Sequence, residues 1–403
     1  MKTIVLIELF WTGHHPTYLK LFTATLLKLG CRVQVLCPEP GELHDWIADN
    51  CKEKISFLEV YEYRKPELSQ FPQGRILSAI MMLKRWKTAA KAVKKIAADA
   101  HTIPDLVFFT YLDVYLNKFI PYQLIDRIFT FKWSGLYFAP YQLRLPVTQK
   151  DILFRLNPLD RDSVFKAKHC HAVTVLDEGV ISKLQAKLKG KSVISFPDFA
   201  DVSSPDYDYE VANLVKEKAG SRTVIGLLGH IDKRKGLLTL MEVAEKTADK
   251  NYFFVVAGKF IESSFTKQEL GIISRYRNSN PTNCFFHLEF IPDEPSFNAL
   301  VACCDIIFAA YERFYYSSNL LTKAAYFCKY VIVSDGYCMA ERTTKYHLGA
   351  IIKEGNVVDC INAIGNLVNK IQNRDQNEQP NYRRYMSDHS TEQLKRSFAA
   401  IVK

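Results

Sequence analysis

The chain has 403 residues, of which 48% are hydrophobic and 24% are charged, so it is long enough for two globular domains and too apolar for a disordered protein. It contains no apolar run of about 18 residues or more, which excludes a conventional membrane-spanning helix. The formal net charge of +10 favours phosphates or anionic surfaces as partners, and we expect no nucleic acid among them.

The cysteines and the N-terminus indicate the compartment. Ten cysteines occur without the C-x-x-C spacing of a metal site, which is typical of reduced, buried thiols. Lys2 and the apolar residues after it look like the start of a signal peptide, but Glu8 interrupts them and no small-residue cleavage pattern follows. We therefore predict a first strand and a cytoplasmic protein.

The first predicted elements form a βαβ unit. Thr3–Leu9 is an apolar run typical of a buried strand, Pro16 opens a helix, and Arg32–Leu36 is a second strand. Gly13 lies in the loop at the carboxyl end of the first strand, where open α/β sheets bind ligands.

The segment from Arg75 to Lys95 has seven basic residues and no acidic one, and apolar residues such as Trp86 lie between them. One interpretation of residues 75–96 is a basic amphipathic helix that lies on an anionic membrane, peripheral on its inner face. The other is a solvated helix that packs its apolar side on a sheet and points its lysines outward. The sequence leaves both interpretations open.

Strand-like and helical stretches alternate along the rest of the chain, which predicts doubly wound parallel sheets. The strand-like runs are Asp105–Phe109, Arg127–Trp133, Ala172–Leu176 and Ser192–Phe196 in the first half, and Thr223–Leu228, Tyr252–Ala257, Cys284–Leu288, Asp305–Ala309, Val331–Ser334 and Ala350–Ile352 in the second. An acidic, turn-rich stretch separates the two series. We expect domains at 1–197 and 223–384, a linker at 198–222, and a C-terminal helix at 385–403 that packs back on the first domain.

A basic loop opens the second half of the chain. Residues Gly229 to Gly236 join a strand to a helix and include three consecutive cations, Lys233 to Lys235. Cations at a helix N-terminus oppose the helix dipole unless an anion joins them. The loop is therefore either a phosphate site or an exposed basic turn.

A second anion site is indicated further along. Ser317, Ser318 and Asn319 precede an apolar helical run that begins at Leu320. Their side chains can cap this helix and leave its first backbone N–H groups pointing outward, where an anion binds well. The alternative is an ordinary helix cap.

These motifs, in this order, resemble retaining glycosyltransferases of family 4, which have the GT-B fold. Gly229–Gly236 resembles the family's G-R-x-x-x-x-K-G segment, with His230 in place of the arginine and Lys235 on the lysine. Further stretches match in order: Gly13–Tyr18, Pro104–Val107, Phe254–Gly258, His287–Asp293, Ala299–Phe308 and Ala310–Asp335. The resemblance covers essentially the whole chain and implies two Rossmann-like, doubly wound α/β domains facing a cleft.

The resemblance also implies which residues bind a nucleotide-sugar donor. In the family, the basic loop and the helix N-terminus hold the donor diphosphate, and the nucleobase packs near the H-x-x-G-F-V-P-D-like run. The implied donor-binding residues are Gly13, Gly229, His230, Lys235, Gly258, Ile291, Ser317, Ser318, Asn319 and Lys323.

Two positions depart from the family. The register set by Cys328–Val333 places Tyr315 and Lys323 where the family has two glutamates, the second of which binds the donor ribose. Lys323 cannot accept a hydrogen bond, so it is expected to meet a phosphate or another anion unless the donor is held differently. Glu312 replaces the first glutamate if the loop carries a short insertion.

In the first domain, Gly13 and His14 are the donor-facing candidates. Adjacent histidines point in different directions, and His15 directly precedes a proline, where it can cap the helix. The acceptor-side candidates are His15, Asp113 and Ser134. Ser134 lies in the stretch Lys132–Phe138, which occupies the place of a family histidine, and Asp113 is equally suited to cap a helix. The spacing gives little support for a metal site, and none is expected.

We therefore expect a glycosyltransferase that moves a sugar from a nucleoside-diphosphate sugar, its co-substrate, to a sugar, lipid-linked or small-molecule acceptor with retention of configuration. The catalytic candidates are His14, Glu312 and Lys235, and no cofactor is expected. The alternative, suggested by the loss of both family glutamates, is a catalytically degenerate GT-B protein that binds a nucleotide or a glycan.

Overall fold

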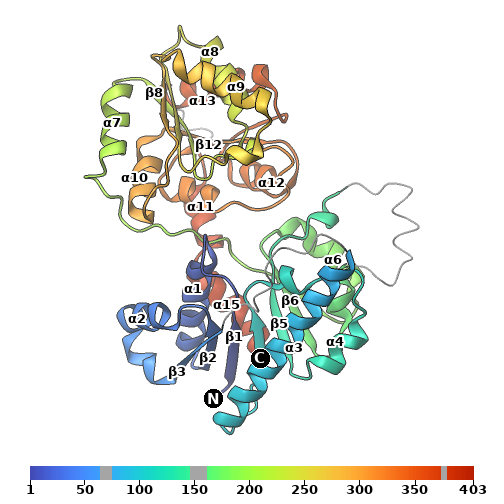
Figure 1. The fold of residues 1–403 in the computed structure, drawn as a ribbon. Helices are drawn as coiled ribbons and strands as arrows, with labels where there is room; N and C mark the ends of the chain where they lie inside the picture. The colour runs from blue at the N-terminus through green and yellow to red at the C-terminus, as the bar shows by residue number, and fades with distance from the viewer. Residues whose placement is uncertain (64–74, 146–160, 374–378) are drawn as a thin grey trace. The chain divides into compact units, whose positions relative to one another are not determined.

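The protein is described here from a computed structural model, which contains two compact units, and each unit is described by itself (Figure 1). The described residues are 1–63, 75–145, 161–373 and 379–403; unit 1 comprises Met1–Pro197 and His389–Lys403, and unit 2 comprises Asp198–Asp388. The stretch 198–222, expected as a linker, therefore belongs to unit 2. The last helix, coloured red in Figure 1, belongs to unit 1.

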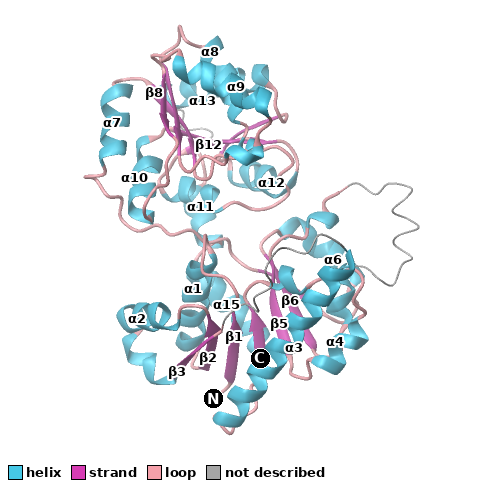
Figure 2. Ribbon diagram, viewed as in Figure 1, coloured by secondary structure: helices cyan, strands magenta, loops and turns pink. Residues whose placement is uncertain are grey.

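Unit 1 is built on a seven-stranded parallel sheet with the strand order β3-β2-β1-β4-β5-β6-β7 (Figure 2). The strands are β1 (Thr3–Ile7), β2 (Arg32–Cys37), β3 (Leu58–Glu62), β4 (Leu106–Phe109), β5 (Trp133–Tyr137), β6 (Cys170–Val175) and β7 (Ser192–Ser195). Every residue of β1 is buried, because a central parallel strand is covered on both faces. This explains the continuous apolar run at the start of the chain.

Helices cover both faces of this sheet. They are α1 (His15–Lys28), α2 (Pro40–Asn50), α3 (Arg75–Asp99), α4 (Tyr122–Ile128), α6 (Ile181–Lys187) and α15 (Thr391–Val402), with 3-10 turns η1 (Lys52–Phe57), η2 (Leu112–Tyr115), η3 (Tyr141–Leu143), η4 (Arg161–Lys166) and η5 (Glu178–Val180). On one face, Phe22 of α1 and Phe398 of α15 pack on Phe108, with ring centroids 5.7 and 5.2 Å away. On the other, Trp86 of α3 packs on Phe109 at 5.1 Å.

Unit 2 repeats the architecture of a sheet flanked by helices (Figure 2). Its six parallel strands have the order β10-β9-β8-β11-β12-β13. The strands are β8 (Thr223–Leu228), β9 (Tyr252–Ala257), β10 (Cys284–His287), β11 (Ile306–Ala309), β12 (Tyr330–Ser334) and β13 (Gly349–Ile352). All pairings between the strands of both sheets are parallel, so the expectation of two Rossmann-like doubly wound α/β domains is confirmed.

The helices of unit 2 also form two layers. They are α7 (Glu210–Ala219), α8 (Leu237–Lys246), α9 (Lys267–Asn278), α10 (Glu294–Cys303), α11 (Asn319–Tyr326), α12 (Tyr337–Tyr346), α13 (Val357–Asn373) and α14 (Tyr382–Asp388), with 3-10 turns η6 (Lys233–Lys235) and η7 (Glu262–Ser264). The core under α8, α9 and α13 includes Leu240 and Ile364, and the core on the opposite face includes Leu300 and Leu321.

The prediction of a strand at Arg127–Trp133 is wrong. Helix α4 occupies the beginning of this stretch and ends at Ile128, and β5 begins only at Trp133. Phe129 is nevertheless fully buried, because it packs on Trp86 from the end of α4, with ring centroids 5.4 Å apart. The apolar run therefore reflects packing of a helix end rather than a strand. The edge strand β3 has no counterpart among the predicted strands, since its polar residues obscure the pattern.

No helix in the described part of the chain is long and apolar enough to cross a membrane.

Candidate functional site

The topology points to one place in each unit. The strand order reverses between β1 and β4 in unit 1 and between β8 and β11 in unit 2. Open α/β sheets bind ligands beyond the carboxyl ends of the strands at such a switch point, because the two following loops turn to opposite faces and leave room between them. The loops after these four strands are therefore the candidate sites.

In unit 2, the loop after β8 and the loop after β11 lie directly against each other. The backbone N–H of Glu312 donates to the carbonyl of Arg234, with 2.7 Å between the two atoms. Gly236 has a φ of +74°, and a Cβ atom there would lie 2.9 Å from the carbonyl oxygen of Ala310. The structure thus brings together the basic loop and the 310–335 segment, which the sequence singled out separately.

Lys235 has a different environment from the other two cations of this loop. Its amine lies 3.9 Å from the ring centroid of Tyr311, a cation–π geometry that orients the charge without neutralising it. The Lys233 amine instead pairs with Glu269 at 2.6 Å, and Arg234 pairs with Asp232 at 2.7 Å. Among the described residues, Lys235 is the cation of η6 that has no carboxylate partner.

The predicted glycines allow the loops to approach closely. Gly258, which follows β9, has a φ of +136°, and a Cβ atom there would lie 1.9 Å from the carbonyl oxygen of Gly229. Gly229 itself has a φ of +101°. Only glycine fits this contact without a backbone shift, so both predicted positions are needed by the fold of the candidate site itself.

Glu312 lies beside a second acid. Burial raises the pKa of the Glu312 carboxyl, the Glu354 carboxylate adds to this effect, and Lys233 and Arg313 oppose it. Glu354 also accepts a hydrogen bond from the backbone N–H of Arg313 at 2.9 Å. The two acids and the basic loop therefore share the carboxyl edge of the sheet, and sequence reasoning missed both Glu354 and Tyr311.

The capped helix is present as expected. Ser318 is the N-cap of α11, and its hydroxyl oxygen accepts from the backbone N–H of Leu320 at 3.4 Å. Ser317 is buried, and Asn319 is the first helical residue. The backbone N–H of Leu321 donates to the carbonyl of Ser318 at 3.0 Å, so an ordinary helix cap is present.

Lys323 does not lie where an anionic ligand would meet it. Its side chain is only 2% exposed, and its amine donates to Glu294 Oε2 at 2.7 Å, to Asn298 Oδ1 and to the backbone carbonyl of Asp201. Burial lowers the pKa of Lys323, although Glu294 opposes the shift. The amine ties α10, α11 and the chain segment after Asp198 together, an arrangement that does not favour donor contact.

The remaining predicted donor residues of unit 2 differ in exposure. His230 is exposed, so it is not a core histidine, and it stands in the same loop as Lys235. Ile291 lies in the loop between β10 and α10. It is 8% exposed and belongs to the hydrophobic core of unit 2.

In unit 1, the switch point is formed by a compact polar and aromatic cluster. Gly13 has a φ of +62°, and α1 begins at His15 with His14 as its N-cap, without a side-chain cap hydrogen bond. His15 therefore does not cap the helix. Its Nδ1 atom instead lies 3.0 Å from Oε2 of Glu8, a buried carboxylate that immediately follows β1. The ring of His14 stacks on Phe138, with centroids 4.6 Å apart.

The two other acceptor-side candidates are built into the framework. Asp113 accepts from the backbone N–H groups of Phe138 at 2.7 Å and Ala139 at 3.0 Å, and burial raises the pKa of its carboxyl. It lies inside η2 rather than at its N-cap. Ser134 is fully buried in β5, where its hydroxyl oxygen accepts from the backbone N–H of Ala172. Both side chains hold the loop and strand that follow β4.

Glu8 belongs to this cluster but is not among the site residues that the sequence predicted. The signal was present, because a single acid within a continuous apolar run is costly to bury unless it is hydrogen-bonded.

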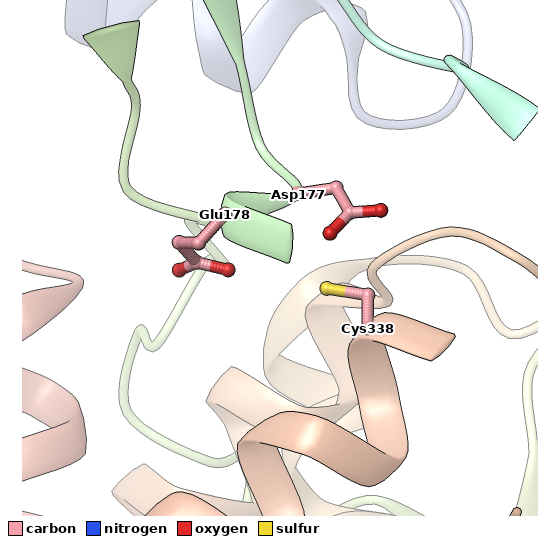
Figure 3. A group of neighbouring side chains, drawn as sticks. All are labelled: Asp177, Glu178 and Cys338. Carbon is pink, nitrogen blue, oxygen red and sulfur yellow. The ribbon is translucent and has the colours of Figure 1, made fainter. Parts of the chain in front are cut away.

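Side chains that can bind a metal ion are frequent in the sequence, but their grouping is limited. Within the described residues of either unit, no three His, Cys, Asp or Glu side chains converge on one point. Figure 3 shows Asp177 and Glu178 at the start of η5 in unit 1, and Cys338 in the first turn of α12 in unit 2. Asp177 accepts from the backbone N–H of Gly179 at 3.0 Å and pairs with Arg144, so its carboxylate is already used within unit 1.

A basic hollow lies away from both switch points. It has a volume of about 390 Å³, and its lining residues are Lys166, Lys187, Leu188, Lys189 and Lys191. Lys187 pairs with Asp162 at 2.8 Å, and Lys191 donates to the carbonyls of Ala167 and Cys170 at 3.0 and 2.6 Å. Two of its four lysines are thus bound to protein acceptors.

Comparison with known proteins identifies the fold. The sequence matches no protein-family model and no curated protein. Among solved structures, Anabaena HepE in complex with UDP and glucose has a TM-score of 0.65 and 13% identity, with 99% of each chain covered. A glycosyltransferase from Rickettsia africae has a TM-score of 0.65 and 12% identity, covering 100% of this chain and 98% of the other.

A third similar structure is sucrose-phosphate synthase from Thermosynechococcus elongatus, with a TM-score of 0.68 and 14% identity over 99% of this chain and 98% of the other. All three similarities extend over essentially the entire chain rather than over one unit. At this level of identity they establish the architecture, and the chain has the GT-B fold that the motifs predicted.

Proposed function

We propose that the protein is a glycosyltransferase that moves a sugar from a nucleoside-diphosphate sugar to a hydroxyl acceptor, with retention of configuration. The observation that carries the proposal is the contact between the basic loop and the 310–335 segment at the β8/β11 switch point. Similar folds that bind UDP and glucose, or that bear the name glycosyltransferase, support the same substrate class.

In this reaction the leaving nucleoside diphosphate gains negative charge as the bond to the sugar breaks. Lys235 is the cation of the loop that is not already paired with a carboxylate, so its amine is suited to stabilise that charge. His230 and the N-terminus of α11 at Ser318 and Asn319 would add donors. The mechanism proposed here uses these protein groups in place of a metal ion.

Glu312 is proposed to take the place of the first family glutamate. Its backbone is fixed to Arg234 of the basic loop, and its carboxyl lies close enough to Glu354 for the two acids to influence each other. The ribose contact is not assigned to Lys323, because its amine is bound by Glu294 and Asn298.

The test is Lys235→Ala with Lys233→Ala as the matched control. Both changes remove one lysine from the same three-residue turn, but Lys233 pairs with Glu269. We expect Lys235→Ala to lower kcat/KM for nucleoside diphosphate release by about 100-fold or more without changing thermal stability. Lys233→Ala should remain within a few fold of wild type. Equal rates for wild type and Lys235→Ala would refute the assignment.

A binding module without turnover is the second candidate. The observation that favours it is that Tyr315 and Lys323 stand at the positions of the family glutamates and that Lys323 is committed to protein acceptors. Calorimetry with UDP and a panel of nucleotide sugars distinguishes the two. Donor binding without consumption, in the presence of a broad set of sugar and lipid-linked acceptors, would favour the module.

Peripheral binding to an anionic membrane through α3 is proposed as a separate property. Trp86, Val93 and Ile96 are buried in the core of unit 1, so they are not available to a bilayer. Arg85 also turns inward and donates to the carbonyl of Val114 at 2.8 Å. Most of the apolar side of the helix thus packs on the sheet.

An exposed stripe nevertheless remains on α3. Leu77 and Ile80 are 46% and 44% exposed, and Lys84, Lys87 and Lys91 follow them at helical spacing with exposed side chains. Apolar side chains beside a row of lysines suit the headgroup region of an anionic bilayer.

The membrane test compares two double charge reversals. Lys84→Glu with Lys91→Glu alters the stripe, and Lys216→Glu with Lys218→Glu alters exposed positions of α7 in unit 2 by the same charge. Each lysine near an anionic surface contributes about 1 kcal/mol, so we expect the first variant to bind phosphatidylserine liposomes at least tenfold more weakly in sedimentation. The control should bind as wild type does. Equal loss in both variants would indicate a net-charge effect and refute the stripe.

A further inference from the structure

The basic hollow of unit 1 has no part in the proposed reaction. Its volume is about 390 Å³, and it is called the lysine hollow after its lining residues Lys166, Lys187, Leu188, Lys189 and Lys191. Lys166 ends η4, which precedes β6, and the other four residues lie at the end of α6 and in the turn before β7. The lysine hollow is therefore at the amino ends of these parallel strands, whereas the switch-point loops follow the carboxyl ends.

Two of the four lysines are held in place by unit 1 itself. The Lys191 amine donates to the carbonyl of Ala167 at 3.0 Å and to the carbonyl of Cys170, the first residue of β6, at 2.6 Å. The Lys187 amine pairs with Asp162 at 2.8 Å, and Asp162 is fully buried. Both amines are thus positioned before a ligand arrives, which lowers the entropic cost of binding.

The other two lysines remain available to a ligand. Lys166 and Lys189 are exposed, and neither forms an ion pair or a side-chain hydrogen bond with another residue in the described part of the chain. The turn that carries Lys189 closes through Gly190, which has a φ of +78°, and through a hydrogen bond of 3.0 Å from the Lys191 N–H to the Leu188 carbonyl. Glycine adopts this φ without strain, so the turn has a defined shape.

The charges of the lysine hollow are not balanced by the protein. Its described lining contains no acid, and Asp162 neutralises one of the four lysines. The carbonyls that bind Lys191 have no net charge, and the C-terminal end of α6 offsets only about half an elementary charge. More than two positive charges therefore remain around one small volume. They repel one another, and an anion with two negative charges would remove most of this repulsion.

Charge and size together indicate a phosphate monoester. Such a group has a charge of about −1.5 to −2 at pH 7 and three strong acceptor oxygens. Lys166 and Lys189 offer their amines, and the ammonium group of Lys191 has a third hydrogen beyond the two that its carbonyls accept. The volume lies within the range of small-molecule sites, about 300–1,000 Å³, so an organic group attached to the phosphate has room as well.

We propose that the lysine hollow binds the phosphate monoester group of a small phosphorylated molecule or of a lipid headgroup. Lys166 and Lys189 contact the phosphate, Lys191 donates its remaining hydrogen, and the pairing of Lys187 with Asp162 keeps this carboxylate from repelling the ligand. The site goes beyond the proposed glycosyl transfer, because it uses no residue of either switch point.

Chemical acetylation of lysines in the full-length protein, followed by mass spectrometry, tests binding residue by residue. The soluble probes are glycerol 3-phosphate, a monoester, and dimethyl phosphate, a diester with one charge. At ten times its Kd, glycerol 3-phosphate should slow acetylation of Lys166 and Lys189 by about tenfold. The matched control residues are Lys216 and Lys218, exposed lysines of α7 in unit 2, which should react as before. Protection by dimethyl phosphate to the same degree would overturn the proposal.

Vesicles distinguish the two sources of the phosphate. Phosphatidic acid presents the same monoester on a bilayer, and phosphatidylcholine vesicles serve as the blank. Protection of Lys166 and Lys189 by glycerol 3-phosphate assigns a free small molecule, whereas protection by phosphatidic acid vesicles alone assigns a lipid headgroup. Protection by neither probe would overturn the proposal, and so would equal protection of Lys216 and Lys218.

A pair of double variants completes the test. Lys166→Gln/Lys189→Gln should bind the protecting probe about tenfold more weakly or worse in calorimetry, because charge-assisted hydrogen bonds to phosphate are lost. Lys216→Gln/Lys218→Gln removes the same charge and should bind as wild type does. Equal affinities of the two double variants would overturn the proposal. Donor turnover should be unchanged in both, so failure of this site and failure of the proposed function are distinguishable.

Discussion

The two units share one topology but fill their switch points differently. In unit 2, the loops beyond β8 and β11 meet through backbone atoms, glycines and cations, with Lys235 over Tyr311. In unit 1, the region beyond β1 and β4 is filled by side chains: a buried carboxylate is bonded to a threonine and to a histidine, and the histidine ring packs against aromatic rings. The first arrangement is built from backbone groups and cations, and the second from buried side chains.

The difference shows what each kind of site demands from the sequence. A phosphate site needs close backbone approach and positive charge, which short loops with glycine and lysine provide. A site built from side chains needs partners held by several elements. Ligand binding in unit 2 should therefore be sensitive to the substitution of single glycines. Ligand binding in unit 1 should be sensitive to the loss of buried hydrogen bonds.

Two glycine substitutions give the sharpest test of this comparison. In Gly258→Ala the new Cβ would lie 1.9 Å from the carbonyl of Gly229, and in Gly135→Ala it would lie 2.5 Å from the carbonyl of Phe109. Each overlap with backbone should cost about 3 kcal/mol or more. Gly271→Ala, in α9, is the control, since a Cβ there meets nothing within 4 Å. It should be neutral or stabilising.

The losses of stability in Gly258→Ala and Gly135→Ala can be distinguished by spectroscopy. All four tryptophans belong to unit 1: Trp11, Trp46, Trp86 and Trp133. In urea unfolding, Gly135→Ala should move the fluorescence transition to lower urea, whereas Gly258→Ala should leave it in place and shift part of the circular dichroism transition. Under native conditions only Gly258→Ala should weaken UDP binding. Identical fluorescence shifts in both variants would contradict independent roles for the two glycines.

The buried charges of the two units provide a second, smaller test. Glu8 accepts from protein donors, whereas Lys323 donates to Glu294, Asn298 and the carbonyl of Asp201. Burial lowers the pKa of Lys323 from its usual 10.5. Between that lowered pKa and 10.5, the unfolded chain binds more protons than the folded one, so the contribution of this residue to stability rises with pH across this window.

Lys323→Met should remove this pH dependence. The free energy of unfolding of wild type minus that of Lys323→Met is expected to rise with pH in this window, by at most about 1.4 kcal/mol per pH unit. Urea unfolding followed by circular dichroism from neutral pH to pH 10.5 provides the measurement. Lys329→Met is the control, because its amine donates to the carbonyl of Ala302 at 2.7 Å outside this cluster. Parallel curves for wild type and Lys323→Met would show that Lys323 has an ordinary pKa.

Sequence reasoning succeeded where the pattern was local. The apolar runs of β1, β8 and β9 predicted buried parallel strands, and the positive φ angles of Gly229, Gly236 and Gly258 agree with glycines at the loop positions that the motifs indicated. It failed at Arg127–Trp133, because an apolar helix end and a short buried strand have the same composition. The spacing of apolar residues in such a short run does not distinguish a helix end from a buried strand.

The sequence by itself determined the two-sheet architecture and the basic loop around Lys235, because strand burial, glycine turns and charge runs are written into consecutive residues. Only the tertiary structure decided the partners of Lys323 and the contact of Glu8 with His15 and Thr110. These contacts join segments far apart in the chain, and Glu8 and Thr110 are 102 residues apart. Whether a buried charge binds a ligand or a protein neighbour depends on which remote groups the fold brings to it.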